Sequence, residues 1–145
     1  MSSWIGVGQS DIGLVRTLNQ DAFAVLDEVG VWAVADGIGG HVGGEVAAQT
    51  AIGTIQAEAR TTNTLLYSDQ ASSVEVLTDL ISRAHEAIVN QARSKSKLKG
   101  MGTTIVLLAI VSGPAPIAYL AHVGDSRAYR FRSGTLTPLT KDHTL

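Results

Sequence analysis

Three aspartates stand at the ends of predicted strands, where carboxylates are exposed and able to do chemistry. Asp21 precedes the apolar run 22–26, Asp36 follows the run 31–35, and Asp125 lies in a turn after the run 117–123. The chain has no cysteine and only 4 histidines, so oxygen atoms would have to supply most ligands of a metal ion. An isolated aspartate at a strand end is usually a turn residue. Together, the three indicate a hard divalent cation such as Mg²⁺ or Mn²⁺.

A glycine cluster follows Asp36 and is typical of a functional loop. Positions 37–44 hold 5 of the 15 glycines, between a predicted strand and a predicted helix. A dinucleotide-binding loop is disfavoured because its pattern requires glycine at position 42, where the chain has Val42, and because a carboxylate would repel the pyrophosphate. Two interpretations remain open on these residues alone. Asp36 and the exposed Gly37 carbonyl bind a metal ion, or Asp36 caps the next helix.

The elements that must position these residues follow from hydrophobic periodicity. Short apolar runs predict strands at 4–8, 22–26 and 31–35, the last two joined by a hairpin turn at 27–30. Apolar residues at helical spacing predict a helix over 44–60. After a loop at 61–73, the capping box of Ser72 and Glu75 starts a second helix that ends near Arg93. The remaining runs predict a three-stranded antiparallel meander at 103–112, 117–123 and 128–132, so the fold class is α+β.

Composition and charge exclude several classes of protein. At 145 residues and 45% hydrophobic content the chain is long and apolar enough to fold, and it has no apolar run that could span a membrane. It also lacks the basic start and apolar stretch of a signal peptide, so we expect a soluble, cytoplasmic protein that binds neither membranes nor nucleic acid. The net charge of −2 conceals an acidic segment 1–90 and a basic segment 91–145. The densest basic stretch, 93–99, is interpreted as a solvated linker, with a surface for an anionic partner as the alternative.

Taken together, these segments resemble the bacterial form of the PP2C-type (PPM family) metal-dependent serine/threonine protein phosphatases. The resemblance extends over the whole chain, because several motifs occur in the family's order. The matching segments are 8–16, 19–23, 34–41 with 44–45, 102–104, 122–127 with Tyr129, and 142–144.

The resemblance implies a role for each candidate site residue. Asp36 would bridge two Mn²⁺ or Mg²⁺ ions, the Gly37 carbonyl and Asp21 would serve one of them, and Asp125 would help to hold a third, weaker ion. Arg16 would bind the substrate phosphate. His41 would donate a proton to the leaving seryl or threonyl oxygen, with a loop histidine bonded to backbone as the alternative. His122 is expected to be a structural histidine with satisfied hydrogen bonds.

The resemblance also implies a fold and a limit. The expected architecture is an α-β-β-α sandwich of two antiparallel sheets flanked by helices, in a single domain over 1–145 that is truncated at its C-terminus. The family's later metal-binding aspartates are absent from the chain, so we expect residues 1–145 alone to hydrolyse phosphoserine poorly. The expected substrate is a phosphoprotein made by a serine/threonine kinase. The alternatives are a non-catalytic binding module and a fragment that a second polypeptide completes.

Overall fold

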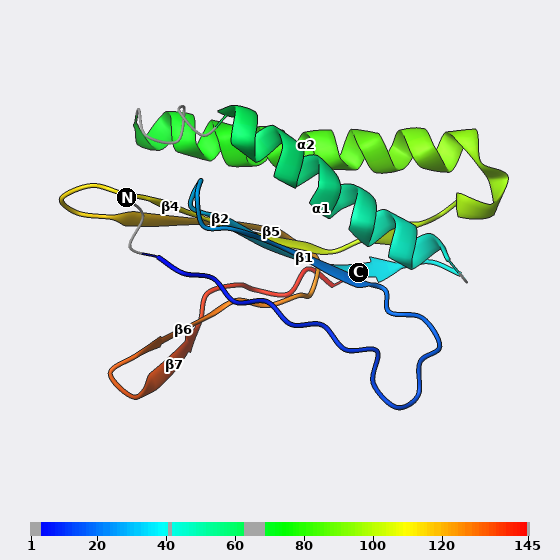
Figure 1. Ribbon diagram of the computed structural model, residues 1–145, viewed down its shortest axis with the longest axis horizontal. Helices are drawn as coiled ribbons and strands as arrows, with labels where there is room; N and C mark the ends of the chain where they lie inside the picture. Colours follow the sequence, from blue (N-terminus) through cyan, green and yellow to red (C-terminus); the bar gives the residue numbers. More distant parts are fainter. Residues whose placement is uncertain (1–3, 41, 63–68, 145) are drawn as a thin grey trace.

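The computed structural model describes residues 4–40, 42–62 and 69–144, which form a helical layer on a main sheet with a hairpin on the opposite side (Figure 1). Strands precede and follow two consecutive helices, as the α+β class requires. In chain order the elements are β1 (Asp21–Leu26), β2 (Val31–Ile38), α1 (Gly43–Thr62), α2 (Gln70–Ser94), η2 (Ser96–Leu98), β3 (Gly102–Thr103), β4 (Ile105–Val111), β5 (Ile117–Val123), β6 (Tyr129–Arg132) and β7 (Thr135–Pro138).

The main sheet has the strand order β1-β2-β4-β5, and β3 pairs with the far end of β2. All these pairs are antiparallel. The predicted turn between β1 and β2 is present: Val29 N donates to Leu26 O, and Gly30 adopts a φ of 69° that favours glycine. This tight turn sets the register that places Asp21 directly opposite Asp36. The hairpin therefore brings two of the three predicted aspartates together.

Alternation along β2 assigns its side chains to two faces. Val31, Ala33 and Ala35 are buried, and they belong to the same core as Ala47, Ala48, Ile52 and Ile55 of α1. Trp32, Val34 and Asp36 therefore point to the opposite face, because successive side chains of a strand alternate. Helices cover only one face of this sheet (Figure 1). The aspartate pair lies on the face away from them.

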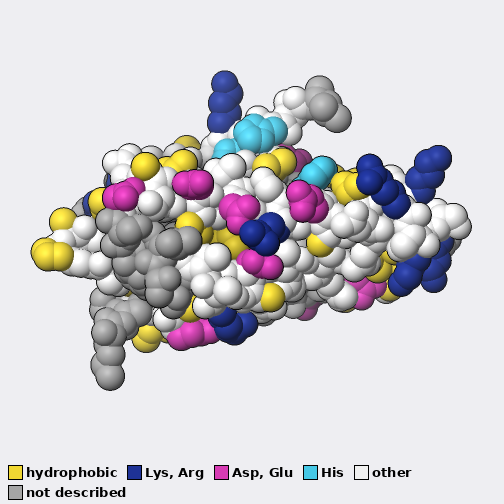
Figure 2. Space-filling view, turned by 90° about the horizontal axis from the view of Figure 1, so that it is seen from above, with side chains coloured by type: hydrophobic (Ala, Val, Ile, Leu, Met, Phe, Trp, Pro, Cys, Tyr) yellow, Lys and Arg dark blue, Asp and Glu magenta, His cyan; other side chains and the backbone are white. Residues whose placement is uncertain are grey.

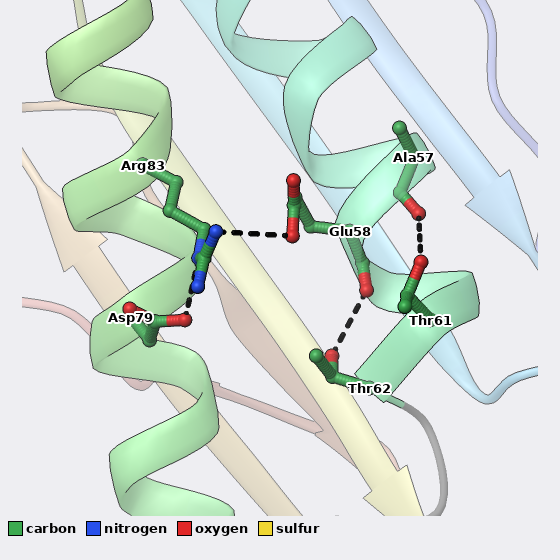
Figure 3. Close-up of polar contacts among 6 residues, drawn as sticks. All are labelled: Ala57, Glu58, Thr61, Thr62, Asp79 and Arg83. Atoms are coloured by element: carbon green, nitrogen blue, oxygen red, sulfur yellow. Dashed lines mark hydrogen bonds and ion pairs between the residues drawn. The ribbon is translucent and has the colours of Figure 1, made fainter.

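The two helices also meet at the surface. Arg83 of α2 contacts Asp79 of its own helix at 2.7 Å and Glu58 of α1 at 3.5 Å (Figure 3). At the end of α1, the hydroxyl groups of Thr61 and Thr62 donate to backbone carbonyls one turn earlier. The helix therefore continues for two residues beyond its predicted end at residue 60. Neither helix of the described residues is long and apolar enough to cross a bilayer.

The predicted start of α2 was wrong by about one turn. Asp69 is the N-cap, and its carboxylate accepts a hydrogen bond from Ser72 N at 2.7 Å. Ser72 is therefore inside the helix, and the Ser72–Glu75 spacing does not form the predicted capping box. A carboxylate is an equally good cap, and using it adds a turn of helix before the Val76 and Leu77 contacts with the core.

The predicted three-stranded meander was also wrong. β4 and β5 pair as expected, but β6 pairs with β7 in a separate two-stranded sheet. After β5, Gly124 adopts a φ of 103°, and the chain crosses to the face of the main sheet opposite the helices (Figure 1). The backbone turns back at Ser133 and Gly134, both at positive φ, which is the geometry of a tight hairpin. The predicted second sheet is thus present.

The predicted strand at 4–8 is extended but forms no ladder in the described structure. It lies against the open face of the main sheet, where a Cβ on Gly6 would meet the Trp32 ring at 2.0 Å and one on Gly8 would meet the Phe23 ring at 2.2 Å. Asp27 Oδ1 accepts hydrogen bonds from both Gly6 N and Trp32 Nε1. Ring contacts and one carboxylate replace the expected strand pairing.

Candidate active site

A cleft of about 550 Å³ opens where β1 begins and β2 ends, on the sheet face away from the helices. It brings together five of the six residues for which the sequence predicted a role. Those five residues are Arg16, Asp21, Asp36, Gly37 and Asp125. The sixth, His41, lies outside the described residues. A second cavity of about 860 Å³ lies beside α2, but its walls are mainly apolar and contain none of these residues.

The electrostatic centre of the cleft is the Asp21–Asp36 pair. Burial raises the pKa of Asp36, and the neighbouring Asp21 raises it further through charge repulsion and a shared hydrogen bond. Asp125 adds a weaker effect in the same direction, while the positive charge of Arg16 lowers the pKa. A divalent cation bound between these two carboxylates would offset their mutual repulsion.

Close packing explains the glycines around the pair. A Cβ on Gly37 would lie 1.8 Å from the Gly44 carbonyl oxygen, and one on Gly44 would lie 2.6 Å from the Gln20 amide nitrogen. The first turn of α1 therefore rests directly on the backbone at the end of β2. Asp36 itself does not cap this helix, because β2 continues to Ile38 before α1 begins at Gly43. The helix-cap interpretation of Asp36 was wrong.

Thr104 is a site residue to which sequence reasoning assigned no role. Its Oγ1 accepts a hydrogen bond from Asp36 N at 3.0 Å, and its own N–H donates to Asp36 O at 2.9 Å. The same hydroxyl lies 2.6 Å from Ser126 Oγ, next to Asp125. Thr104 is 4% exposed and connects the end of β2 to the Asp125 turn. The only sequence signal for Thr104 was its place in the 102–104 motif, because its partner Asp36 lies 68 positions away in the chain.

A short loop presents Arg16 to the cleft. Asp11 accepts a hydrogen bond from Gly13 N at 2.7 Å, and Gly13 has a φ of 74° that permits the reversal. Asn19 links both sides of the loop, because its side chain donates to Ser10 Oγ and accepts from Asp21 N. Asp11 and Asn19 also line the cleft. These residues hold the guanidinium near the carboxylates without any regular secondary structure.

His122 does not satisfy its hydrogen bonds as predicted. Its Nδ1 is buried, with no hydrogen-bond partner in the described part of the chain, and its ring stacks on His143 at a centroid distance of 4.4 Å. His143 holds the turn before Asp125 with two hydrogen bonds to Gly124. Its ring Nδ1 accepts from Gly124 N, and its backbone N–H donates to Gly124 O. Both rings therefore support the turn without lining the cleft.

The oxygen donors of the cleft fit part of the metal site that the sequence predicts. Within residues 4–40, 42–62 and 69–144, no three His, Asp or Glu side chains converge tightly enough to form a metal site by themselves. The Asp21–Asp36 pair and the neighbouring Gly37 backbone supply hard oxygen donors, which suit one Mn²⁺ or Mg²⁺ ion. These residues fit one ion, and further carboxylates would be needed to hold a second.

Comparison with known proteins decides the family. The family model for protein phosphatase 2C matches residues 13–144. The chain belongs to this family. It is 35% identical over 140 residues to the serine/threonine phosphatase stp of Listeria welshimeri, covering 94% of this chain and 54% of that protein. It is equally similar, at 35% over 139 residues, to the phosphatase PstP of Mycobacterium tuberculosis, covering 94% of this chain and 24% of that protein.

Solved structures of the protein phosphatase 2C family have the same fold. The PstP catalytic domain, solved in complex with 2 manganese ions, matches with a TM-score of 0.76 and 33% identity. That match covers 92% of this chain and 54% of the solved chain. The predicted family and the predicted pair of antiparallel sheets with helices are confirmed. The chain spans about half the length of the Listeria phosphatase that it matches.

Proposed function

We propose that this chain forms the N-terminal part of a metal-dependent phosphatase domain that hydrolyses phosphoserine and phosphothreonine in proteins. The observation that carries the proposal is the cross-strand pair of Asp21 and Asp36, which share one cleft with Arg16. Substrates would be cytoplasmic phosphoproteins made by a serine/threonine kinase. The protein phosphatase 2C family and the named activities of the relatives support this assignment.

In this proposal, oxygen donors of the cleft hold the metal ions. Asp21, Asp36 and the Gly37 carbonyl would hold one Mn²⁺ or Mg²⁺ ion, Asp36 would also contribute to a second, and Asp125 would contribute to a third, weaker one. When bound, such ions lower the pKa of water and offset negative charge at phosphorus. Thr104 would fix the position of the Asp36 backbone through its two hydrogen bonds.

Arg16 and His41 would act on the substrate itself. The planar guanidinium of Arg16 can donate two hydrogen bonds to phosphate oxygens at once, which orients phosphorus for attack by water. As the bond between phosphorus and the seryl oxygen breaks, the leaving oxygen takes a proton from the His41 imidazolium. The products are inorganic phosphate and the free hydroxyl group. A histidine suits this step because its pKa lies near neutrality.

The Asp21–Asp36 assignment is tested by titration calorimetry with Mn²⁺. The wild-type chain should release or absorb heat on binding, and Asp36→Asn should lose this signal because it removes a proposed carboxylate ligand. Asp79→Asn, which changes an exposed aspartate on α2, is the matched control and should bind like the wild type. Equal heats from wild type and Asp36→Asn would refute the metal site.

Catalysis needs a separate experiment, because the proposed chemistry would require a second metal ion beside the first. Phosphate release from a phosphoserine peptide should be very slow with residues 1–145 alone. It should rise strongly when the chain is extended by the later carboxylate-bearing segments of a relative, or when these are added as a second polypeptide. Equal turnover in all cases would show that residues 1–145 are sufficient. Mn²⁺ binding without turnover in any case would favour a non-catalytic binding module.

A further inference from the structure

The basic stretch 93–99 has no assigned function in the proposed chemistry. Its cations come from the end of α2, from η2 and from the residues beside them, and all of them are exposed. The set consists of Arg93, Lys95, Lys97 and Lys99. Figure 2 shows Lys and Arg side chains gathered at the end of the molecule where Figure 1 places the end of α2. Among the described residues, none of these four cations pairs with a carboxylate, whereas Arg60, Arg83 and Arg127 do.

An apolar groove begins at this basic surface. This is the cavity of about 860 Å³ beside α2, with Ile88 and Val89 of the helix on one side and Met101 and Ile105 on the other. Arg93 and Lys99 line the same cavity, so two of the four cations stand directly at its wall. A groove of this composition suits a ligand that is apolar along one part and anionic along another.

The groove and the candidate active site are neighbours. Thr103 lines the groove while the next residue, Thr104, lines the cleft that contains Asp36. On β5, Val123 lines the groove, and Asp125 lines the cleft two residues later. The two cavities therefore share a wall built from the start of β4 and the end of β5. A substrate segment in the groove and the phosphorylated residue in the cleft would lie on opposite sides of this wall.

From these observations we propose that the groove is a docking site for an acidic, apolar segment of the phosphoprotein substrate, separate from its phosphorylated residue. The proposal rests on the function proposed above. Apolar side chains of the segment would pack beside Ile88 and Val89, and its carboxylates would lie near Arg93 and Lys99. Glu86 also lines the groove, about two turns before Arg93. Its charge would repel the acidic part, so the acidic part should lie at the Lys99 end.

The test measures binding of a short fluorescein-labelled peptide with leucines in its first half and glutamates in its second, by fluorescence anisotropy. The wild-type chain should bind it, more weakly at about 0.5 M than at about 0.05 M NaCl because salt screens exposed charges. The triple change Lys95→Gln, Lys97→Gln, Lys99→Gln should weaken binding at least about 3-fold, since each exposed ion pair contributes little by itself. Glu86→Gln should strengthen binding.

The matched control removes the same number of charges elsewhere. Arg130→Gln, Arg132→Gln, Lys141→Gln changes the net charge equally but alters exposed residues outside the groove, and it should bind the peptide like the wild type. Thermal unfolding followed by circular dichroism would check that both triple variants are folded. A Val89→Gln variant tests the apolar part and should weaken binding without changing any charge.

Four results would overturn the proposal: no binding, equal weakening by both triple variants, equal binding of a peptide with glutamine in place of glutamate, or binding to phosphatidylglycerol vesicles but not to the peptide. The last would identify a lipid surface. The Asp36→Asn variant tests the docking groove separately from the proposed metal site. It disables the metal site and leaves the groove intact, so it should still bind the peptide. If Mn²⁺ binding fails while peptide binding succeeds, the groove binds acidic segments but the phosphatase assignment is wrong.

Discussion

Substitutions of Thr104 should distinguish the contribution of its hydroxyl group from that of its methyl group. In Thr104→Val the shape is kept, but Asp36 N and Ser126 Oγ both lose a partner at a position that is 4% exposed. A lost hydrogen bond costs roughly 0.5 to 1.5 kcal/mol, and an unpaired buried group costs more, so the free energy of unfolding should fall by about 2 kcal/mol. For a chain of this size the melting temperature should fall by about 4 to 8 °C.

The same change should weaken Mn²⁺ binding, because the hydroxyl of Thr104 holds the backbone of a proposed ligand. Loss of a group that orients a ligand typically costs 10- to 100-fold in metal affinity, so we expect at least about a 10-fold higher Kd. Thr104→Ser keeps the hydroxyl but removes the methyl group that packs under Gly124. It should therefore lose stability while keeping the Mn²⁺ affinity.

The assay compares both variants with the wild type by urea unfolding and by Mn²⁺ calorimetry. Thr135→Val on β7 is a control for the change from threonine to valine at an exposed position, and it should affect neither measurement. The Thr104 hydroxyl does not position the ligand if Thr104→Val binds Mn²⁺ like the wild type, or if the serine and valine variants lose affinity equally. The second result would mean that only packing matters at this position.

Three further predictions follow from the same structure. Gly37→Ala places a Cβ 1.8 Å from the Gly44 carbonyl and should cost at least about 3 kcal/mol in urea unfolding, whereas Gly53→Ala, at an open position inside α1, should stabilise the protein by about 0.5 to 1 kcal/mol. Asp69→Ala should lower the melting temperature at pH 7. Hydrogen bonds to Ser72 lower the pKa of Asp69, so its stabilisation is complete above the ordinary pKa of 3.8 and is lost as the pH falls through the lower pKa of the folded state. In an active, extended form of the domain, Arg16→Ala should lower kcat/KM on a phosphopeptide roughly 10- to 150-fold, and an unchanged kcat/KM would remove Arg16 from the site.

Much of the fold could be predicted because its signals are local. The tight turn at 27–30 follows from residues adjacent in sequence, and it is sufficient to place Asp21 opposite Asp36. The helical stripes of α1 and α2 and the β4–β5 pair were predicted for the same reason. The start of α2 was missed because two local caps of similar strength compete, and Asp69 is the one that the helix uses.

Long-range relations were decided only by the tertiary structure. Local pattern shows that β6 is a strand, but it does not show which neighbour it pairs with, and a positive φ at Gly124 sends the chain to the opposite face. The predicted strand at 4–8 has the correct extended shape, yet its partners are the rings of Phe23 and Trp32. The partner of a strand depends on which strand edges the rest of the folded chain leaves unpaired. The sequence of a single segment does not contain this information.

The same distinction between local and long-range information applies to the candidate site. The sequence by itself determined which residue types could hold a cation and bind phosphate, because that chemistry belongs to Asp36, Asp21 and Arg16 individually. The sequence also predicted that Asp125 belongs to the same site, but only the tertiary structure connected it to Asp36 through Thr104, across 68 positions of sequence. Such contacts exist only after the sheet has assembled, because hydrogen bonds between distant segments depend on the packing of everything between them.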